Sequence, residues 1–410
     1  MQPRLPRVMA PVTAMPPGLP GTPVMRAPPR ADPLSTRLVV WGCGAVLGLL
    51  AADAVLGAYE AGLSPFKPSW FALLAVVFCA GATLLSGPRF APAALLVLAL
   101  PLARLFDAAV LARVEASALD QIAMDLLRMT VVLFSILAVL STDAGLRAAR
   151  VAAVLAILLT VGSEVYEMLG FAKFTTIEGR YAGFNGHPNF PPILLCEMLG
   201  VCFALVRSFR VNCLLIALSF VGVALTYGRS GFIVLTLMAG AYVLLNLRRN
   251  LGFVLLMALL AAPAAGVLFA VLESRTQHGI LRDQNTAERL EAILTLDFEK
   301  LKSPERAQDL SDAWEAVLEK PLLGHGTGVS GTIWAPHNEW VSIWLEMGIP
   351  GLLLFGGTFA LLVLRCALTG GRAGFLVFAM LAFTPAGQGR LETPHFMLAL
   401  ATAAHLLWPA

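Results

Sequence analysis

The chain has 410 residues, of which 58% are hydrophobic and only 13% are charged, and its formal net charge is +3. Soluble domains carry about 25% charged residues, so this composition excludes an ordinary soluble protein, and so small a charge gives no reason to expect a nucleic-acid partner. Apolar runs long enough to cross a bilayer as helices recur along the chain, without the alternating pattern of a membrane β-barrel. We therefore predict an all-α, polytopic membrane protein.

Residues 1–37 differ from the rest of the chain. They are rich in proline and hold five arginines against one acidic residue, Asp32. A segment of this composition cannot bury a core, so we expect it to be disordered. A basic tail ahead of the first span also predicts that the N-terminus is cytoplasmic.

About twelve apolar segments follow, and we predict each as a transmembrane helix. They lie near residues 38–58, 69–86, 90–109, 125–142, 150–170, 190–206, 212–227, 231–247, 252–272, 350–368, 373–386 and 394–408. The prediction divides the protein into a bundle at 38–272, a polar loop at 273–349 and three last spans within 350–410. With both termini inside, the short cytoplasmic loops carry arginine, as the positive-inside rule requires, and the long loop lies outside.

The long outer loop contains a predicted helix. Ser303 and Pro304 form a helix start, and Pro321 and Gly324 mark its end. Four apolar side chains recur there at helical spacing: Leu310, Trp314, Val317 and Leu318. They predict one face that lies on the membrane surface or on the bundle.

Three arginines are predicted on the outer side, against the usual charge bias. Arg180 lies in the loop from Gly179 to Asn189, Arg229 lies in a tight turn between two spans, and Arg289 lies in the long loop. Because a guanidinium group binds phosphate oxygens in pairs and stays charged, these residues predict an anion site. The alternative is that they extend to lipid headgroups.

His337 is the histidine that best fits a chemical role. It precedes Trp340, Ile343, Trp344 and Met347, which recur at helical spacing, so it is predicted at a helix N-terminus. That position disfavours the protonated ring and keeps a neutral base available. His187 is the second candidate, although its place before Pro188 favours a role in shaping the loop. His395 and His405 are predicted to be structural.

The acidic residues leave a different function open. Asp53, Glu164, Glu167 and Glu197 lie in or near predicted spans, where acids are costly and usually functional, so a proton or ion path remains an alternative. Asp297 and Glu299 form an acidic pair in the long loop, but no further ligand set accompanies them, and no metal site is predicted.

Three ordered segments carry a resemblance to a known family. The first is the loop R-x-x-G-x-x-x-H-P-N from Arg180 to Asn189, and the second is the turn at Arg229. The third runs through Trp314, Pro321-Leu322-Leu323-Gly324, His337-Asn338 and Glu346-x-Gly348-x-x-Gly351. In this order, on a scaffold of many spans, they resemble the O-antigen ligase and polymerase superfamily of bacterial inner-membrane proteins.

The resemblance implies a C-type glycosyltransferase fold and an inverting, metal-independent transfer, without a cofactor, at the periplasmic face of the inner membrane. The donor would be O-antigen linked to undecaprenyl diphosphate, and the acceptor would be a sugar hydroxyl of lipid A-core. Arg180 and Arg229 would hold the diphosphate, and His337 would act as the base. No arginine stands just before Trp314, where the family often has one, so Arg289 or Arg306 would complete the diphosphate site. Supporting residues are Asn185, His187, Asn189, Asn338 and Glu346.

Other functions fit parts of the same pattern. An O-antigen polymerase of the same superfamily uses the same kind of donor, and a relative that glycosylates protein hydroxyls is a further possibility. A transporter or flippase would explain the number of spans and the acids within them. The sequence contains no clear internal repeat, which is the usual mark of secondary transporters, and this argues against a transporter. The loop pattern and its His337-Asn338 pair favour a ligase over a polymerase, so we predict a ligase.

Overall fold

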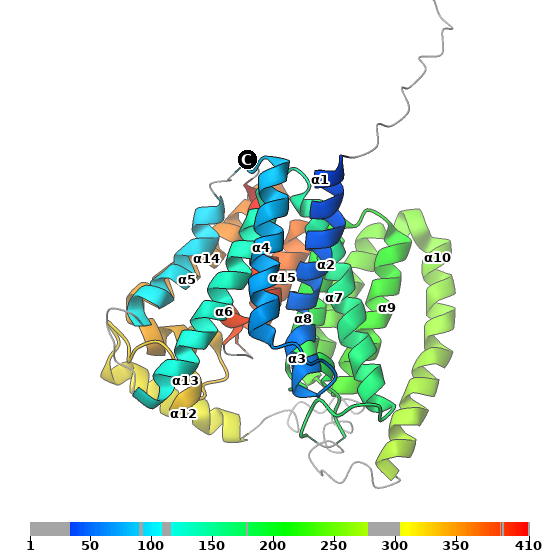
Figure 1. Cartoon of the computed structure of the whole chain (residues 1–410). Coiled ribbons are helices and arrows are strands. Elements are labelled where there is room, and N and C mark those ends of the chain that lie inside the picture. The colour runs from blue at the N-terminus through cyan, green and yellow to red at the C-terminus, as the bar shows by residue number, and fades with distance from the viewer. Residues whose placement is uncertain are drawn as a thin grey trace, which may run out of the picture. The chain divides into compact units, whose positions relative to one another are not determined.

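The computed structural model describes residues 33–89, 93–108, 116–177, 179–277, 304–385, 387 and 389–408. The predictions for Arg289, for the acidic pair Asp297 and Glu299, and for most of the basic N-terminal segment lie outside these residues. The described part of the chain consists of helices and the turns between them (Figure 1).

The helices of the bundle follow the predicted apolar segments. They are α1 (Leu34–Arg37), η1 (Leu38–Cys43), α2 (Gly44–Ala51), α3 (Ala54–Glu60), α4 (Pro68–Ser86), α5 (Ala93–Phe106), α6 (Ala116–Leu140), α7 (Gly145–Met168), α8 (Phe190–Leu205), α9 (Phe209–Thr226), α10 (Arg229–Gln277), α14 (Glu339–Thr369), α15 (Ala373–Phe383) and α16 (Pro394–Leu407). The short elements are η3 (Gly183–Asn185), α12 (Pro304–Glu319), α13 (Val329–Thr332) and η4 (Arg390–Glu392).

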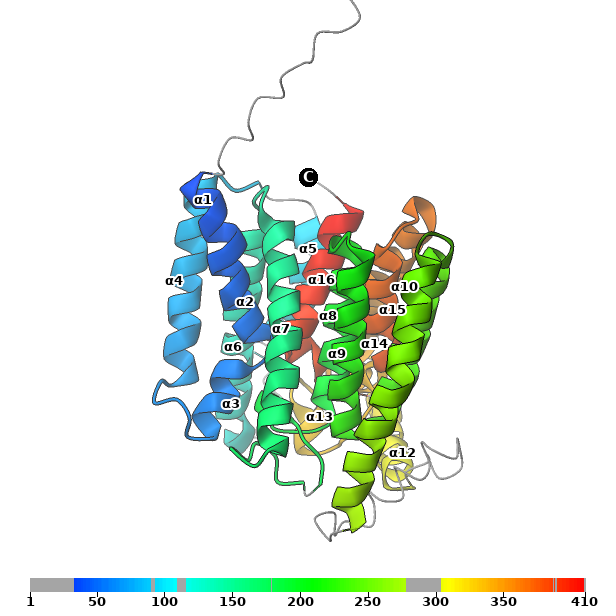
Figure 2. The ribbon, with the colours of Figure 1, turned by 90° about the vertical axis from the view of Figure 1, so that its right-hand side faces the viewer.

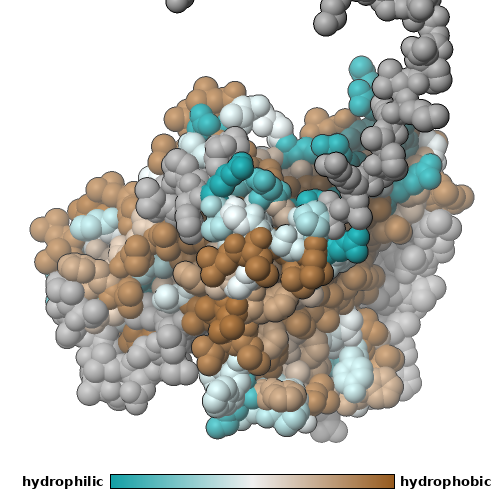
Figure 3. Space-filling model, turned by 45° about the horizontal axis from the view of Figure 1, so that its top comes forward, coloured by the Kyte–Doolittle hydropathy of each residue, from teal (hydrophilic) through white to brown (hydrophobic). Residues whose placement is uncertain are grey.

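Several of these helices have the length and composition of membrane spans. Among the described residues, six are long and apolar enough to cross a bilayer, and five shorter apolar helices accompany them. Large apolar side chains on them face outward, including Leu84, Leu245 and Leu353, each more than two thirds exposed. Hydrophobic residues cover much of the face drawn in Figure 3. The protein is a polytopic helical membrane protein.

Three helix breaks refine the predicted spans. α10 has 49 residues, about twice the length that a bilayer requires, and its backbone leaves the helical region at Asn250 (φ −133°, ψ 21°), between two predicted spans. α14 breaks at Gly348 (φ 65°), so its second part is the span predicted at 350–368. The first span was predicted too long, because α2 ends at Ala51 and Asp53 takes a left-handed conformation (φ 51°) before α3.

The two ends of the bundle carry different elements. α1 begins and α16 ends at one end, whereas α12 and α13 lie at the other, as Figures 1 and 2 show. Arginines of the predicted cytoplasmic loops bind carbonyl groups at the first end: Arg365 donates to the oxygen of Leu407 at 2.8 Å, and Arg372 to that of Val206 at 3.4 Å. The start of α1 and the end of α16 thus lie at the same end of the bundle.

We call α12, α13 and residues 339–347 of α14 the cap. Here α12 packs on the first turns of α14 through small side chains, since Ala313, Ala316 and Val317 are buried against Val341 and Leu345. α12 begins and ends where the sequence predicted, and the four side chains of its predicted apolar face have different surroundings. Val317 is buried and Leu310 packs on the cluster, whereas Trp314 and Leu318 are exposed, because the alanine side of the helix allows the closer approach.

Candidate functional site

The loop that contains Arg180 is held by one carboxylate at the end of α7. Glu167 accepts backbone hydrogen bonds from Phe174 (2.7 Å) and Thr175 (2.8 Å) through one oxygen. Through the other it accepts from Ala182 (2.8 Å) and Gly183 (2.9 Å). Four N–H groups on one buried carboxylate fix both ends of the loop, because bonds to a charged acceptor are stronger than neutral ones.

Arg180 joins this loop to the turn that carries Arg229. Its guanidinium group is buried and donates from Nε to the carbonyl oxygen of Thr226 at 2.8 Å, and from Nη2 to Oδ1 of Asn189 at 3.0 Å. The backbone N–H of Tyr181 also donates to the oxygen of Leu225 at 3.2 Å. Thr226 ends α9 and Arg229, half-buried, begins α10, so the two predicted arginine segments lie side by side at the cap end.

His337 stands directly before α14, as predicted. Asn338 caps the helix, its Oδ1 accepting from the N–H groups of Trp340 (3.0 Å) and Val341 (3.3 Å). His337 itself has a left-handed backbone (φ 49°), a conformation that costs energy for any residue except glycine and that clusters at functional sites. Its ring is about one third exposed, with Nε2 3.6 Å from a carboxylate oxygen of Asp309. The ring is therefore accessible to a substrate.

The surroundings of His337 favour the neutral imidazole. Burial lowers its pKa below the ordinary value, and the positive charge of Arg306 lowers it further, while Asp309 opposes the shift. A lower pKa keeps the ring unprotonated to lower pH, which is the state that accepts a proton from a substrate hydroxyl.

Two glycines of the third segment pack against each other's backbone. A Cβ atom on Gly324 (φ 70°) would lie 2.3 Å from the carbonyl oxygen of Glu346, and one on Gly348 (φ 65°) would lie 2.3 Å from that of Leu322. His325 and Gly326 then donate backbone hydrogen bonds to Leu345 (2.7 Å) and Glu346 (2.9 Å). The Leu322–Gly324 turn and the Glu346-x-Gly348 sequence thus form one unit.

The side chain of Glu346 is the centre of a buried polar cluster. It pairs with Arg104 of α5 at 2.9 Å and accepts from the hydroxyl of Ser330 (2.6 Å) and the N–H of Gly328 (3.0 Å). Arg104 also pairs with Glu392 of η4 at 2.7 Å. These contacts tie the cap to the last loop and to the bundle.

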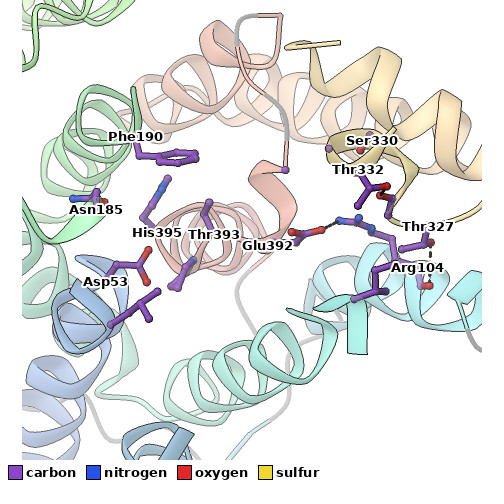
Figure 4. Close-up of a pocket in the computed structure, with 16 residues that line it drawn as sticks. Asp53, Arg104, Asn185, Phe190, Thr327, Ser330, Thr332, Glu392, Thr393 and His395 are labelled. Atoms are coloured by element: carbon purple, nitrogen blue, oxygen red, sulfur yellow. Dashed lines mark hydrogen bonds and ion pairs between the residues drawn. The ribbon is translucent and has the colours of Figure 1, made fainter. Parts of the chain in front are cut away.

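A cavity of about 430 Å³ lies beside this cluster. Figure 4 shows Asp53, Asn185, Phe190 and His395 at one end of it, and Arg104, Glu392 and the hydroxyl-bearing segment 327–332 at the other. The Arg180 loop and the third segment therefore both contribute to its wall, through Asn185 and through residues 327–332.

Residues 214–356 match a protein family described as O-Antigen ligase. An O-antigen ligase domain over these residues supports a place for the chain in the O-antigen ligase/polymerase superfamily. Members are glycosyltransferase-like enzymes that process O-antigen in lipopolysaccharide biosynthesis. No curated protein matches the chain.

The residues expected from the superfamily resemblance do not all lie at one site. Arg180, Asn189 and the Arg229 turn are in direct contact or adjacent, and Asn338 orders the backbone beside His337. His187 is exposed, and its Nδ1 accepts from the N–H of Asn189 at 3.2 Å, which fits the loop-shaping alternative. Asn185 and Glu346 belong to the cavity and its supporting cluster, whereas His337 does not line the cavity.

Sequence reasoning missed a second buried network. His395, predicted to be only structural, lines the cavity, and its Nδ1 is 2.7 Å from Oε2 of Glu197 in α8. The other oxygen of Glu197 pairs with Arg390, whose Nη1 donates to the carbonyl oxygen of Met380 at 2.7 Å. The only signal in the sequence was Glu197, an acid inside a span that requires a buried partner.

Proposed function

We propose that the protein is an O-antigen ligase that transfers an undecaprenyl diphosphate-linked glycan to a sugar hydroxyl of lipid A-core. The observation that carries the proposal is the bond from Arg180 to Thr226, which brings the loop R-x-x-G-x-x-x-H-P-N against the Arg229 turn. Two permanent positive charges at one end of the bundle suit a diphosphate, and superfamily membership supports the same substrate.

The proposed chemistry needs few groups. A diphosphate is a good leaving group once positive charge stabilises it, and Arg180 and Arg229 supply that charge. Arg306 is one of the two arginines considered for completing the diphosphate site, and its charge lowers the pKa of His337, so it is placed to add a further positive charge near that ring. His337 takes the proton of the acceptor hydroxyl, whose oxygen attacks the anomeric carbon opposite the departing diphosphate, so the configuration inverts.

The proposed setting follows from the topology. The termini lie in the cytoplasm, and the cap end faces the periplasm of a Gram-negative inner membrane. Both lipid substrates would then reach the site from the outer leaflet, and the reaction would require neither metal nor nucleotide.

The deciding experiment uses purified protein, undecaprenyl diphosphate-linked O-antigen and lipid A-core, with chelator present and nucleotide omitted. The proposal expects long-chain lipopolysaccharide from the wild type and none from His337→Ala, with both proteins inserted equally in membranes. A lengthened donor glycan with unchanged lipid A-core would instead identify a polymerase. Movement of the lipid-linked glycan across the bilayer without transfer would identify a transporter.

A further inference from the structure

Among the described residues, α12 buries only one of its sides. This packing side contains Ala313, Ala316 and Val317. A second side is exposed and uncharged, and its members recur at the three- and four-residue spacing that keeps side chains on one side of a helix. They are Ala307, Ser311, Trp314 and Leu318. The two large apolar residues of this side, Trp314 and Leu318, are 43% and 59% exposed.

The acidic side chains of α12 lie on a third side. Asp312, Glu315 and Glu319 are exposed and share the same spacing of three and four residues. The helical period places the uncharged side between the packing side and this acidic side. α12 also runs across the end of the bundle rather than along the spans (Figure 1). A helix that has acids on one side and large apolar residues on the next has the pattern of a helix at a membrane surface.

The turn that follows α12 lies at the height at which a membrane span begins. The N–H of Ile349 donates to the carbonyl oxygen of Pro321 at 3.1 Å, just where the membrane-spanning part of α14 starts. Leu322, the next residue, is 66% exposed. Leu353, one turn further into the span, is 69% exposed. The exposed side chain of Leu322 therefore lies at the border of the surface that lipid covers.

The residue types of this region suit the boundary between lipid and water. Tryptophan is enriched there because its ring is apolar and its N–H group is polar. Trp314 packs edge to face on Trp344 of α14, with the ring centroids 5.4 Å apart, so two such rings lie together. Lys320 stands between Leu318 and Leu322 and is exposed, and its side chain is long enough to reach headgroup phosphates.

A bilayer accounts for this surface better than a soluble partner does. Exposed apolar side chains that lie together mark contact with protein or with membrane. Since Leu322 is at the border of the span, a soluble partner on Trp314 and Leu318 would have to occupy the space between α12 and the bilayer. The acids, which would attract a basic partner, lie on a different side of the helix.

We propose that α12 is an interfacial helix, with Trp314, Leu318 and Leu322 immersed in the leaflet on the cap side of the membrane and with its acidic side in water. The same helix carries Asp309, whose carboxylate lies 3.6 Å from Nε2 of His337. Contact with lipid thus fixes the height of His337 relative to the headgroups. The proposal rests on the membrane fold and does not depend on glycan transfer.

The test measures which medium surrounds individual positions of α12. The variants Leu318→Cys, Leu322→Cys and Glu315→Cys are spin-labelled and placed in bilayers. Electron paramagnetic resonance then gives the collision rate of each label with oxygen, which concentrates in lipid, and with a water-soluble nickel chelate. Leu353→Cys is the reference for lipid. Unmodified protein measures the labelling of the six native cysteines, five of which are buried.

The ratio of oxygen to nickel collisions should be high at positions 318 and 322, as at position 353, and low at position 315. Position 315 is the matched control, because it is exposed on the same helix but on the acidic side. A low ratio at 318 and 322 would place these residues in water and overturn the proposal. Low collision rates with both reagents would show that protein covers this side of α12, which would overturn it as well.

A second measurement needs no label. Brominated acyl chains quench tryptophan fluorescence at short range, so the emission of wild type and of Trp314→Phe is compared in brominated and in ordinary bilayers. The difference between the two proteins is the emission of Trp314, and it should be smaller in the brominated bilayers. An unchanged difference would contradict immersion of this ring. Neither measurement uses transfer, so failure of the proposed ligase reaction would leave the interfacial helix standing.

Discussion

Arg104 of α5 and Glu346 of α14 form a buried ion pair at 2.9 Å, although 242 residues separate them in the sequence. Both side chains are at most 5% exposed. Glu392 completes the group from the loop before α16. Together with Glu392, the pair connects three distant parts of the chain beside the cavity, and the glutamate lies within the residues that match the O-antigen ligase family.

Replacing Arg104 by glutamine should destabilise the protein strongly. Removing one partner of a buried pair leaves uncompensated charge and typically costs about 3–5 kcal/mol. In detergent, the melting temperature of Arg104→Gln should fall by several degrees, because about 1 kcal/mol corresponds to roughly 2–4 °C in domains of about 150–250 residues and to less in a longer chain. The matched control is Arg89→Gln at the exposed pair with Asp143, where little change is expected. Equal melting temperatures for the two variants would contradict the structural role of the pair.

The sequence predicted the apolar helices and the arginine segments because both are local patterns. Hydropathy over about 20 residues finds a span, and the start of α12 follows from Ser303 and Pro304. The Arg180 loop and the Arg229 turn were found in the same way, from charges on the outer side of the predicted topology.

The cavity could not be predicted in this way. Arg104 lies in an apolar run, where a basic residue is expected to extend to the membrane surface, and Arg390 lies in a short loop. Their partners come from α14, η4 and α8. Only the packing of distant helices brings these groups together, and no residue spacing along the chain predicts their contacts.

The pH dependence of transfer should respond to the two charges beside His337. Asp309 raises the pKa of the ring and Arg306 lowers it. Transfer requires the neutral ring, so activity falls as pH drops through this pKa. Asp309→Asn should therefore move the acidic limb of the rate profile to lower pH, and Arg306→Gln should move it to higher pH. Each profile is normalised to its own maximum; shifts in the same direction, or none, would argue against His337 as the base.

Lysine substitutions at Arg180 and at Arg229 should have different effects on transfer. Arg180 donates from two nitrogens to Thr226 and Asn189, and a single ammonium group cannot reproduce this geometry. Arg180→Lys should thus lose transfer as completely as Arg180→Ala, whereas Arg229→Lys should keep part of the activity with a higher KM for the donor. Steady-state kinetics on all three variants tests this expectation, and a nearly wild-type Arg180→Lys would show that charge alone is sufficient there.

Glu167 and Glu164 lie on the same helix, α7, so the effects of replacing each by glutamine can be compared directly. Both were candidates for a proton or ion path, but Glu167 accepts four backbone hydrogen bonds from the Arg180 loop, and neither oxygen of Glu164 has a hydrogen-bond partner among the described residues. Glu167→Gln leaves one acceptor oxygen and turns an NH₂ group towards N–H donors, at roughly 1.5–3 kcal/mol for each lost bond. We expect Glu167→Gln to reduce transfer at least about tenfold and to expose residues 171–189 to limited proteolysis. Glu164→Gln should do neither, because it breaks no described bond. Equal damage from both substitutions would instead favour a role for the carboxylates themselves, as in a proton path.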